Sequence, residues 1–292
     1  MINKFSLEDG IFYITNVCNL TCDHCESYNN RNFKGHFLWE THAEQWKGWS
    51  NLVDLERINI HGGEPFTNPD LINWAKNLIE LWPNASEKYI SSNGTLLHTK
   101  IDLCRELIDI GWNIDVVVHD PEQLNQVVET IKEIIKIYTY RILYTDPKKK
   151  RIEFRDKQSG KLLISLEQVY HFIQKSQRLV EDGVIYMHRS NGDKAFKICQ
   201  GECIPAGYFV NGGIYHCYLT SLTSDLTSQF KFEQYAETLL KEYKPCLVTD
   251  SQEEKELFFS IVGKKSIKQC TLCPDKEVLF PIFPLSPKKK LL

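Results

Sequence analysis

The chain has 292 residues, of which 42% are hydrophobic and 25% charged, as in an ordinary soluble globular protein. Its formal net charge of −3 argues against a general nucleic-acid binder, which would carry a basic excess. No apolar run approaches the roughly 20 residues that span a bilayer, and the first residues lack the apolar core of a signal peptide. We therefore expect a cytoplasmic protein with one large or two modest domains.

The ten cysteines indicate metal binding more than disulfides, because a cytoplasmic protein keeps its thiols reduced. They gather near residue 20, at 199–217 and at 270–273, and two stand alone. Cys104 lies among leucines of a predicted helix and is interpreted as a core thiol, and Cys246 is interpreted as structural. The three gatherings are therefore the places to look for metal sites.

The predicted elements alternate between strands and helices along the first two thirds of the chain. Strands are predicted at 11–17, 57–61, 88–92, 113–118, 141–145 and 183–187, and helices at 39–49, 70–81, 99–111, 121–138 and 166–180. Such alternation favours a parallel α/β sheet. Two further strands at 152–154 and 162–164 predict an inserted hairpin, and the basic run 148–151 before it predicts a solvated turn.

The first cysteine group follows the first predicted strand. Cys18, Cys22 and Cys25 have the spacing C-x3-C-x2-C. Thiolates are soft ligands, and one loop can place three of them around an iron–sulfur cube. Three protein ligands would leave one iron open to a small molecule. Zinc is the alternative, although structural zinc prefers paired C-x2-C units and a closed fourth position.

Two further loops at strand ends are candidates for binding that small molecule. Gly62-Gly63-Glu64-Pro65 ends the second strand, and paired glycines let a backbone approach a ligand closely. Ser92 and Asn93 end the third strand and can hydrogen-bond a hydroxyl or a carboxylate. Either segment could instead be a simple turn.

The cysteine loop, with His24 as the ring before Cys25, together with the Gly-Gly-Glu-Pro segment resembles the signature of the radical S-adenosylmethionine (SAM) enzymes. The resemblance implies a [4Fe–4S] cluster whose open iron binds SAM, and an electron that cleaves SAM to methionine and a 5′-deoxyadenosyl radical. It also implies a partial (β/α)6 TIM-like barrel. The SAM-binding residues that it implies are His24, Gly62, Gly63, Glu64, Pro65, Ser92 and Asn93.

The later cysteines form a second candidate site. Cys217 follows a predicted hairpin turned at 211–213, and Cys270 and Cys273 form a knuckle. With Cys199 or Cys203 they complete four thiolates, which suit zinc or an iron–sulfur cluster. The pattern resembles the SPASM/Twitch extensions of radical SAM enzymes, and it has too few cysteines for SPASM. This resemblance implies a small C-terminal Twitch domain of a β-hairpin and helix with an auxiliary [4Fe–4S] cluster.

We accordingly expect a barrel domain at 1–198 with an inserted hairpin at about 148–165, a Twitch-type domain at 199–280 and a mobile tail at 281–292. The resemblance implies an enzyme that takes a hydrogen atom from a peptide or a small molecule, in an oxidation or a peptide modification. It would receive electrons from a donor such as flavodoxin or ferredoxin.

Because barrel enzymes place their chemistry at the C-terminal ends of strands, five side chains there are candidates for orienting the substrate. They are His119, Asp120, Tyr144, His188 and Arg189. Many relatives carry Ser-x-Asp-Gly where this chain has His119-Asp120, which weakens a SAM contact there. The alternative function is a non-catalytic iron–sulfur or zinc protein, acting in electron transfer or as a scaffold.

Overall fold

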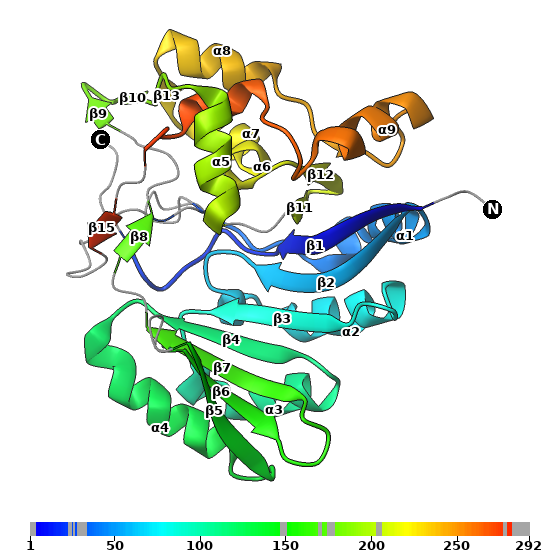
Figure 1. The fold of residues 1–292 in the computed structure, drawn as a ribbon, viewed down its shortest axis with the longest axis vertical. Helices are drawn as coiled ribbons and strands as arrows, with labels where there is room; N and C mark the ends of the chain where they lie inside the picture. Colours follow the sequence, from blue (N-terminus) through cyan, green and yellow to red (C-terminus); the bar gives the residue numbers. More distant parts are fainter. Residues whose placement is uncertain are drawn as a thin grey trace.

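The computed structural model describes residues 4–22, 25, 27, 34–146, 151–168, 171–173, 179–202, 206–276 and 279–281. Its main feature is a ten-stranded sheet with the order β14-β12-β11-β1-β2-β3-β4-β7-β6-β5 (Figure 1). The strands from β11 to β7 in this order run parallel to one another. The chain therefore has an α/β fold with a large, mostly parallel sheet.

Four strand–helix units form the first part of this sheet. The strands are β1 (Phe5–Tyr13), β2 (Val53–His61), β3 (Glu87–Ser92) and β4 (Asn113–Val118), and the helices are α1 (Ala43–Leu52), α2 (Leu71–Leu81), α3 (Ile101–Asp109) and α4 (Leu124–Ile135). Short 3-10 turns precede them at η2 (Trp39–Thr41), η3 (Pro65–Thr67), η4 (Leu97–Thr99) and η5 (Pro121–Gln123). The helices predicted at 39–49, 70–81, 99–111 and 121–138 and the strands predicted at 57–61, 88–92 and 113–118 are confirmed, whereas β1 begins and ends earlier than predicted.

Large aromatic side chains fill the space between the helices and the sheet. Trp46, Trp49, Trp74 and Trp112 are fully buried, and the Phe12 ring stacks on Phe209 with centroids 4.4 Å apart. Burying a side chain of this size contributes roughly 1.5–3 kcal/mol. This aromatic layer packs the helices against one face of the sheet. The other face of the sheet is therefore available to line cavities.

The segment from 140 to 173 differs from the prediction. β5 (Tyr140–Asp146), β6 (Arg151–Asp156) and β7 (Leu162–Gln168) form an antiparallel meander, and β7 pairs in parallel with β4. The predicted hairpin exists, but it extends the main sheet. The helix predicted at 166–180 is wrong, because its first residues continue β7 and strands β8 (His171–Ile173) and β9 (Leu179–Glu181) follow.

The strand predicted at 183–187 exists but lies outside the main sheet. β10 (Val184–Tyr186) pairs with β9 and with β13 (Lys231–Phe232) in a separate small sheet. Asp182 and Gly183 both have positive φ, at 49° and 74°, and join β9 to β10 as a two-residue hairpin turn. The prediction that this strand is the sixth parallel strand of the main sheet is therefore wrong. In the main sheet, β7 is the strand that follows β4 and pairs with it in parallel.

Most later elements gather at the β14 end of the main sheet (Figure 1). They are α5 (Gly192–Glu202), β11 (Ala206–Val210), β12 (Gly213–Tyr215), α6 (Tyr218–Ser221), α7 (Thr223–Gln229), α8 (Gln234–Glu242), β14 (Cys246–Leu247), α9 (Gln252–Ile261) and η6 (Lys268–Leu272), while β15 (Leu279–Pro281) pairs with β8. The predicted hairpin at β11 and β12 is confirmed, with Asn211 and Gly212 at positive φ in its turn. Because β11 pairs with β1, the boundary expected at residue 199 does not separate two sheets.

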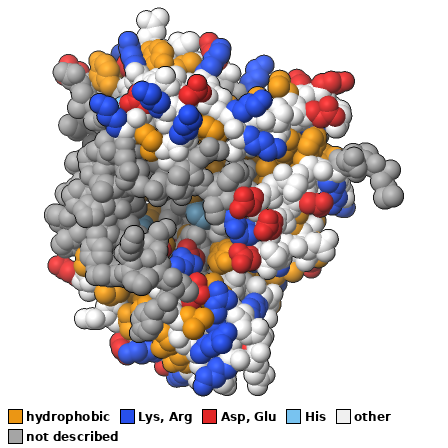
Figure 2. Space-filling view, in the orientation of Figure 1, with side chains coloured by type: hydrophobic (Ala, Val, Ile, Leu, Met, Phe, Trp, Pro, Cys, Tyr) orange, Lys and Arg blue, Asp and Glu red, His pale blue; other side chains and the backbone are white. Residues whose placement is uncertain are grey.

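The described surface carries charges of both signs. Figure 2 shows Lys and Arg interspersed with Asp and Glu, in agreement with the small net charge. None of the helices in the described ranges is long and apolar enough to cross a bilayer.

Candidate functional site

The loop after β2 is joined by backbone hydrogen bonds to the residues before the first cysteine. The Gly63 N–H donates to the Thr15 carbonyl oxygen at 2.7 Å, and the Glu64 N–H donates to the Val17 carbonyl oxygen at 2.8 Å. The parallel pairing of β1 with β2 makes this possible, because both strands end at the same edge. Two motifs forty residues apart in sequence thus become neighbours beside Cys18.

Gly62 is needed where the two loops touch. A Cβ atom at this position would lie 2.7 Å from the carbonyl oxygen of Thr15 and 2.7 Å from its Cγ2 atom. Backbone atoms cannot rotate away as a flexible side chain can. The first glycine of the motif therefore serves the close approach of the two loops.

The buried side chain of Glu64 connects the loop after β2 with the loop after β3. Its side chain is 0% exposed, and its carboxylate accepts hydrogen bonds from the N–H of Phe66 at 3.1 Å, the hydroxyl of Ser92 at 3.0 Å and the N–H of Asn93 at 2.8 Å. Burial raises its pKa to about 7. Glu64 is not among the described residues that line the neighbouring cavity, so its predicted contact with SAM stays a prediction.

A cavity of about 440 Å³ opens at this edge of the sheet, which is a usual volume for a small-molecule site. Seven of the predicted metal- and SAM-binding residues line it: Cys18, Cys22, Cys25, Gly62, Gly63, Ser92 and Asn93. Pro65 is buried beside Glu64, and His24 lies outside the described residues. The three cysteines and the two strand-end loops therefore share one cavity, as their proposed chemistry requires.

The surroundings of Cys18 suit a sulfur that is bound to a metal. Burial raises the pKa of its thiol to about 12, so the ionised form needs a compensating positive charge such as iron. The Leu20 N–H donates to its sulfur at 3.4 Å, and the Asn93 side-chain amide donates at 3.8 Å. The donor set therefore fits a metal cluster bound through sulfur.

His119, a predicted candidate, also lines this cavity. It follows β4, and its Nδ1 atom lies 3.5 Å from the sulfur of Cys22. Burial lowers the pKa of the His119 ring to about 4, so the ring is neutral near pH 7. The structure thus places His119 against the sulfur of Cys22, which is one of the predicted cluster ligands.

The other four candidates lie elsewhere. The Asp120 carboxylate accepts the Glu122 N–H at 3.0 Å at the start of η5, and Tyr144 belongs to the edge strand β5. Arg189 pairs with Glu233 at 2.6 Å. Asp120, His188 and Arg189 are not among the described residues that line this cavity. Their roles toward a substrate stay predictions.

The structure adds cavity residues that the sequence analysis missed. His61 forms a short hydrogen bond through Nδ1 with the Tyr218 hydroxyl, and its Nε2 atom lies 2.9 Å from the hydroxyl of Ser91. The Tyr208 and Tyr218 rings meet edge to face, with centroids 4.7 Å apart. His61 ends β2, so the rule that selected His119 could have selected it.

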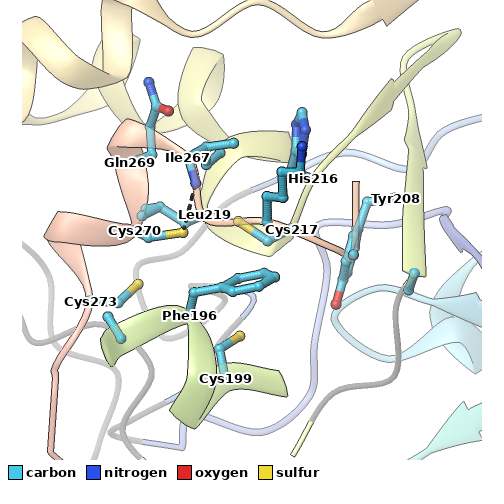
Figure 3. A pocket seen from close by; sticks show the side chains of 14 residues that line it. Phe196, Cys199, Tyr208, His216, Cys217, Leu219, Ile267, Gln269, Cys270 and Cys273 are labelled. Atoms are coloured by element: carbon cyan, nitrogen blue, oxygen red, sulfur yellow. Dashed lines mark hydrogen bonds between the residues drawn. The ribbon is translucent and has the colours of Figure 1, made fainter. Parts of the chain in front are cut away.

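The later cysteines surround a second, smaller cavity of about 90 Å³. The cysteines among its lining residues are Cys199, Cys217, Cys270 and Cys273. They come from α5, the residue before α6, and η6 with the residue after it, and they face a space into which Phe196 also projects (Figure 3). Cys203 lies outside the described residues.

The second set of thiols encloses a cavity. Within the described ranges, no three His, Cys, Asp or Glu side chains are grouped closely enough for one metal ion. Burial raises the pKa of the Cys270 thiol to about 11, and the Ile267 N–H donates to its sulfur at 3.4 Å. Four thiols of this kind are a donor set that suits a metal cluster.

The two cavities share a wall. Ala206 and Tyr208, both on β11, line the large cavity and the small one. The strand pairing of β11 with β1 places this wall beside the strand that leads into the first cysteine loop. The two cavities thus meet at β11, the first lined by Cys18, Cys22 and Cys25 and the second by the later cysteines.

The chain is similar to several solved structures, each at low sequence identity. No curated protein matches it. Among solved structures, BtrN in complex with AdoMet and 2-DOIA is 16% identical, covering 95% of this chain and 100% of that chain at a TM-score of 0.48. Native anSMEcpe with bound AdoMet and a Kp18Cys peptide is 16% identical over 44% of this chain and 40% of its own, at a TM-score of 0.34. SuiB of Streptococcus suis bound to its precursor peptide SuiA is 18% identical over 45% of this chain and 38% of its own, at a TM-score of 0.28.

The family comparison covers the cysteine loop and the strand-end loops described above. Residues 12–144 match the model of the Radical SAM superfamily, so this part of the chain is similar to a radical SAM domain.

Proposed function

We propose that this protein is a radical SAM enzyme with an auxiliary [4Fe–4S] cluster, which oxidises its substrate in the cavity between the two sets of cysteines. The observation that supports this most strongly is the wall shared by the two cavities, formed by Ala206 and Tyr208. A substrate in the large cavity would lie between a source of radicals and an acceptor of electrons. A plain electron carrier has no need of such a cavity.

The residues around the large cavity fit the first cofactor pair. Cys18, Cys22 and Cys25 would hold the cluster, and Gly62, Gly63, Ser92 and Asn93 would surround SAM. When bound, cluster and cofactor together supply the 5′-deoxyadenosyl radical. The protein's part is to position the cofactor and to shield the site from water.

The second site would take the auxiliary cluster. Four thiolates are available there, one for each iron atom of a four-iron cluster. They would come from Cys199, Cys217, Cys270 and Cys273. Such a cluster offers no open position to a substrate. The substrate must therefore be held by side chains of the large cavity.

The hydrogen-bonded chain of Tyr218, His61 and Ser91 suits that task. Both ring nitrogens of His61 are engaged, which fixes the orientation of its ring. Hydroxyl and imidazole groups at the cavity wall can bind a substrate hydroxyl or amine. A small molecule or a short peptide segment fits the volume of about 440 Å³, and oxidation of an alcohol to a ketone fits the two-electron chemistry.

The test is a SAM-cleavage assay on the anaerobically reconstituted protein. With dithionite as reductant, the wild-type protein should form 5′-deoxyadenosine and methionine. The protein in which Cys18, Cys22 and Cys25 are all replaced by Ala should form neither. Cleavage that survives the triple change would show that these cysteines do not hold the cluster.

The substrate can be sought by comparing metabolites and peptides of cells with and without the protein. A candidate that is deuterated at the reacting carbon should then deliver deuterium to 5′-deoxyadenosine. Product formed without this transfer would exclude abstraction from that carbon. A protein that binds iron but never cleaves SAM would favour the electron-transfer alternative, and one that holds only zinc would favour a scaffold.

A further inference from the structure

A side chain of the first cavity contacts a cluster ligand directly. His119 is the first residue after β4. It is half-buried and lines the same cavity as the three cysteines. Its Nδ1 atom is 3.5 Å from the sulfur of Cys22, which is within hydrogen-bond distance for sulfur. The substrate contact expected for His119 from its place at a strand end would leave this contact with Cys22 unexplained.

The direction of the hydrogen bond follows from the state of the cysteine. A cysteine bound to iron is a thiolate, which has no proton and can only accept. The Nδ1 atom of His119 must then carry the proton and donate it toward sulfur. Cys18 receives comparable donors, the Leu20 N–H at 3.4 Å and the Asn93 amide at 3.8 Å.

Donors to sulfur change the reduction potential of a cluster. Each N–H group stabilises the negative charge that sulfur carries, and the reduced cluster carries more of it than the oxidised cluster. A hydrogen bond to sulfur therefore raises the potential. Since His119 reaches its ligand through a side chain, a substitution can remove the bond while the backbone donors remain.

We propose that His119 is a positioning residue that raises the reduction potential of the SAM-binding cluster through an Nδ1–H···S hydrogen bond to Cys22. This inference rests on the proposed function, because it assumes a cluster on Cys18, Cys22 and Cys25. It concerns how easily that cluster accepts the electron and not whether the cluster is present.

The test compares two variants of similar size. His119→Asn keeps an N–H group near the place of Nδ1, whereas His119→Leu has none. Reconstituted wild-type and variant proteins are titrated with reductant, and the cluster is followed by the electron paramagnetic resonance signal that changes when SAM is added. His119→Leu should shift the midpoint to a more negative potential, and His119→Asn should keep the midpoint close to the wild-type value.

Equal midpoints for wild type and His119→Leu would overturn the inference, as would equal shifts in both variants. A wild-type protein without any SAM-responsive signal would instead contradict the proposed function. If His119→Leu loses its iron, a second measurement decides the matter. In wild-type protein labelled with 15N-histidine, the reduced cluster should couple to a ring nitrogen, and this coupling should vanish in His119→Asn; a spectrum unchanged by the substitution would overturn the inference.

Discussion

A methyl group at position 62 would meet the backbone that leads into the cysteine loop. Because its Cβ atom would lie 2.7 Å from the Thr15 carbonyl oxygen, Gly62→Ala must push the two loops apart. We expect a loss of about 1–3 kcal/mol in the free energy of unfolding, together with weaker SAM binding. Equilibrium denaturation and SAM titration of the reconstituted protein measure both.

Gly192→Ala is the matched control for this substitution. Its nearest contact would be a side-chain methyl of Thr271 at 3.3 Å, and the position begins helix α5. SAM affinity should be unchanged in this variant. Equal effects of the two substitutions on SAM binding would show that the close approach at Gly62 has no special role.

The buried carboxyl of Glu64 predicts a pH dependence of stability. Its pKa is raised from 4.5 to about 7 in the folded protein, so the folded state holds a proton that the unfolded state releases. The stability from this group is fully present below pH 4.5. This contribution to the free energy of unfolding, about 3 kcal/mol, falls as the pH rises and is lost as the pH passes about 7.

Glu64→Gln isolates this contribution, because an amide does not titrate. The difference in unfolding free energy between wild type and variant, measured without SAM, should fall steadily from pH 5 to pH 7.5. The amide should also weaken these contacts, since its NH₂ group takes the place of one carboxylate oxygen and cannot accept the hydrogen bond which that oxygen accepts, for example from the Asn93 N–H. A difference that stays constant with pH would contradict the raised pKa.

At the scale of single elements, helix α5 brings Cys199 to the second cavity. Cys199→Ala should therefore remove the iron of the auxiliary cluster and leave the SAM-responsive signal intact. Cys246→Ala is the control, because Cys246 is a buried residue of strand β14 and is absent from the described lining of both cavities. It should lower stability and keep all the iron. Iron that survives Cys199→Ala but not Cys203→Ala would transfer the role to Cys203.

Elements with strong local signals could be predicted from the sequence. The α4 helix has apolar residues at helical spacing, and Val127, Ile131 and Ile134 are fully buried as that spacing requires. The turn at Asn211 and Gly212 adopts the positive φ values that this residue pair favours. In both cases the local preference agrees with the final packing.

The predictions that are wrong concern strands whose pairing partners are distant in the sequence. The helix predicted to begin at Leu166 is strand there instead, because Leu166 pairs with Val116 of β4 and with Ile152 of β6 and so continues β7. The Asp182-Gly183 pair was itself a hairpin signal that the sequence analysis did not use.

The candidate site was predictable to a similar extent. Cysteine spacing and strand-end glycines identified the residues of the large cavity, since these motifs are local. Tyr208 and Tyr218 could not be found this way, because they reach the cavity only through the pairing of β11 with β1.

At the scale of the whole molecule, the segments after residue 206 are fastened to the main sheet. The indole N–H of Trp49 donates to the Gly212 carbonyl oxygen at 3.0 Å, and the Asn16 amide lies 3.4 Å from the Asp225 carboxylate. One sheet thus fixes the relation between the two sets of cysteines. A substrate held at Tyr208 would be placed against both.

The iron content of two triple variants tests this account most directly. Reconstituted wild type should bind about 8 iron atoms, as two four-iron clusters. Replacing Cys18, Cys22 and Cys25 with Ala should leave about 4 iron atoms and no response to SAM. Replacing Cys217, Cys270 and Cys273 with Ala should also leave about 4, with the electron paramagnetic resonance response to SAM retained. A first variant that is colourless and holds zinc would contradict the two-cluster account.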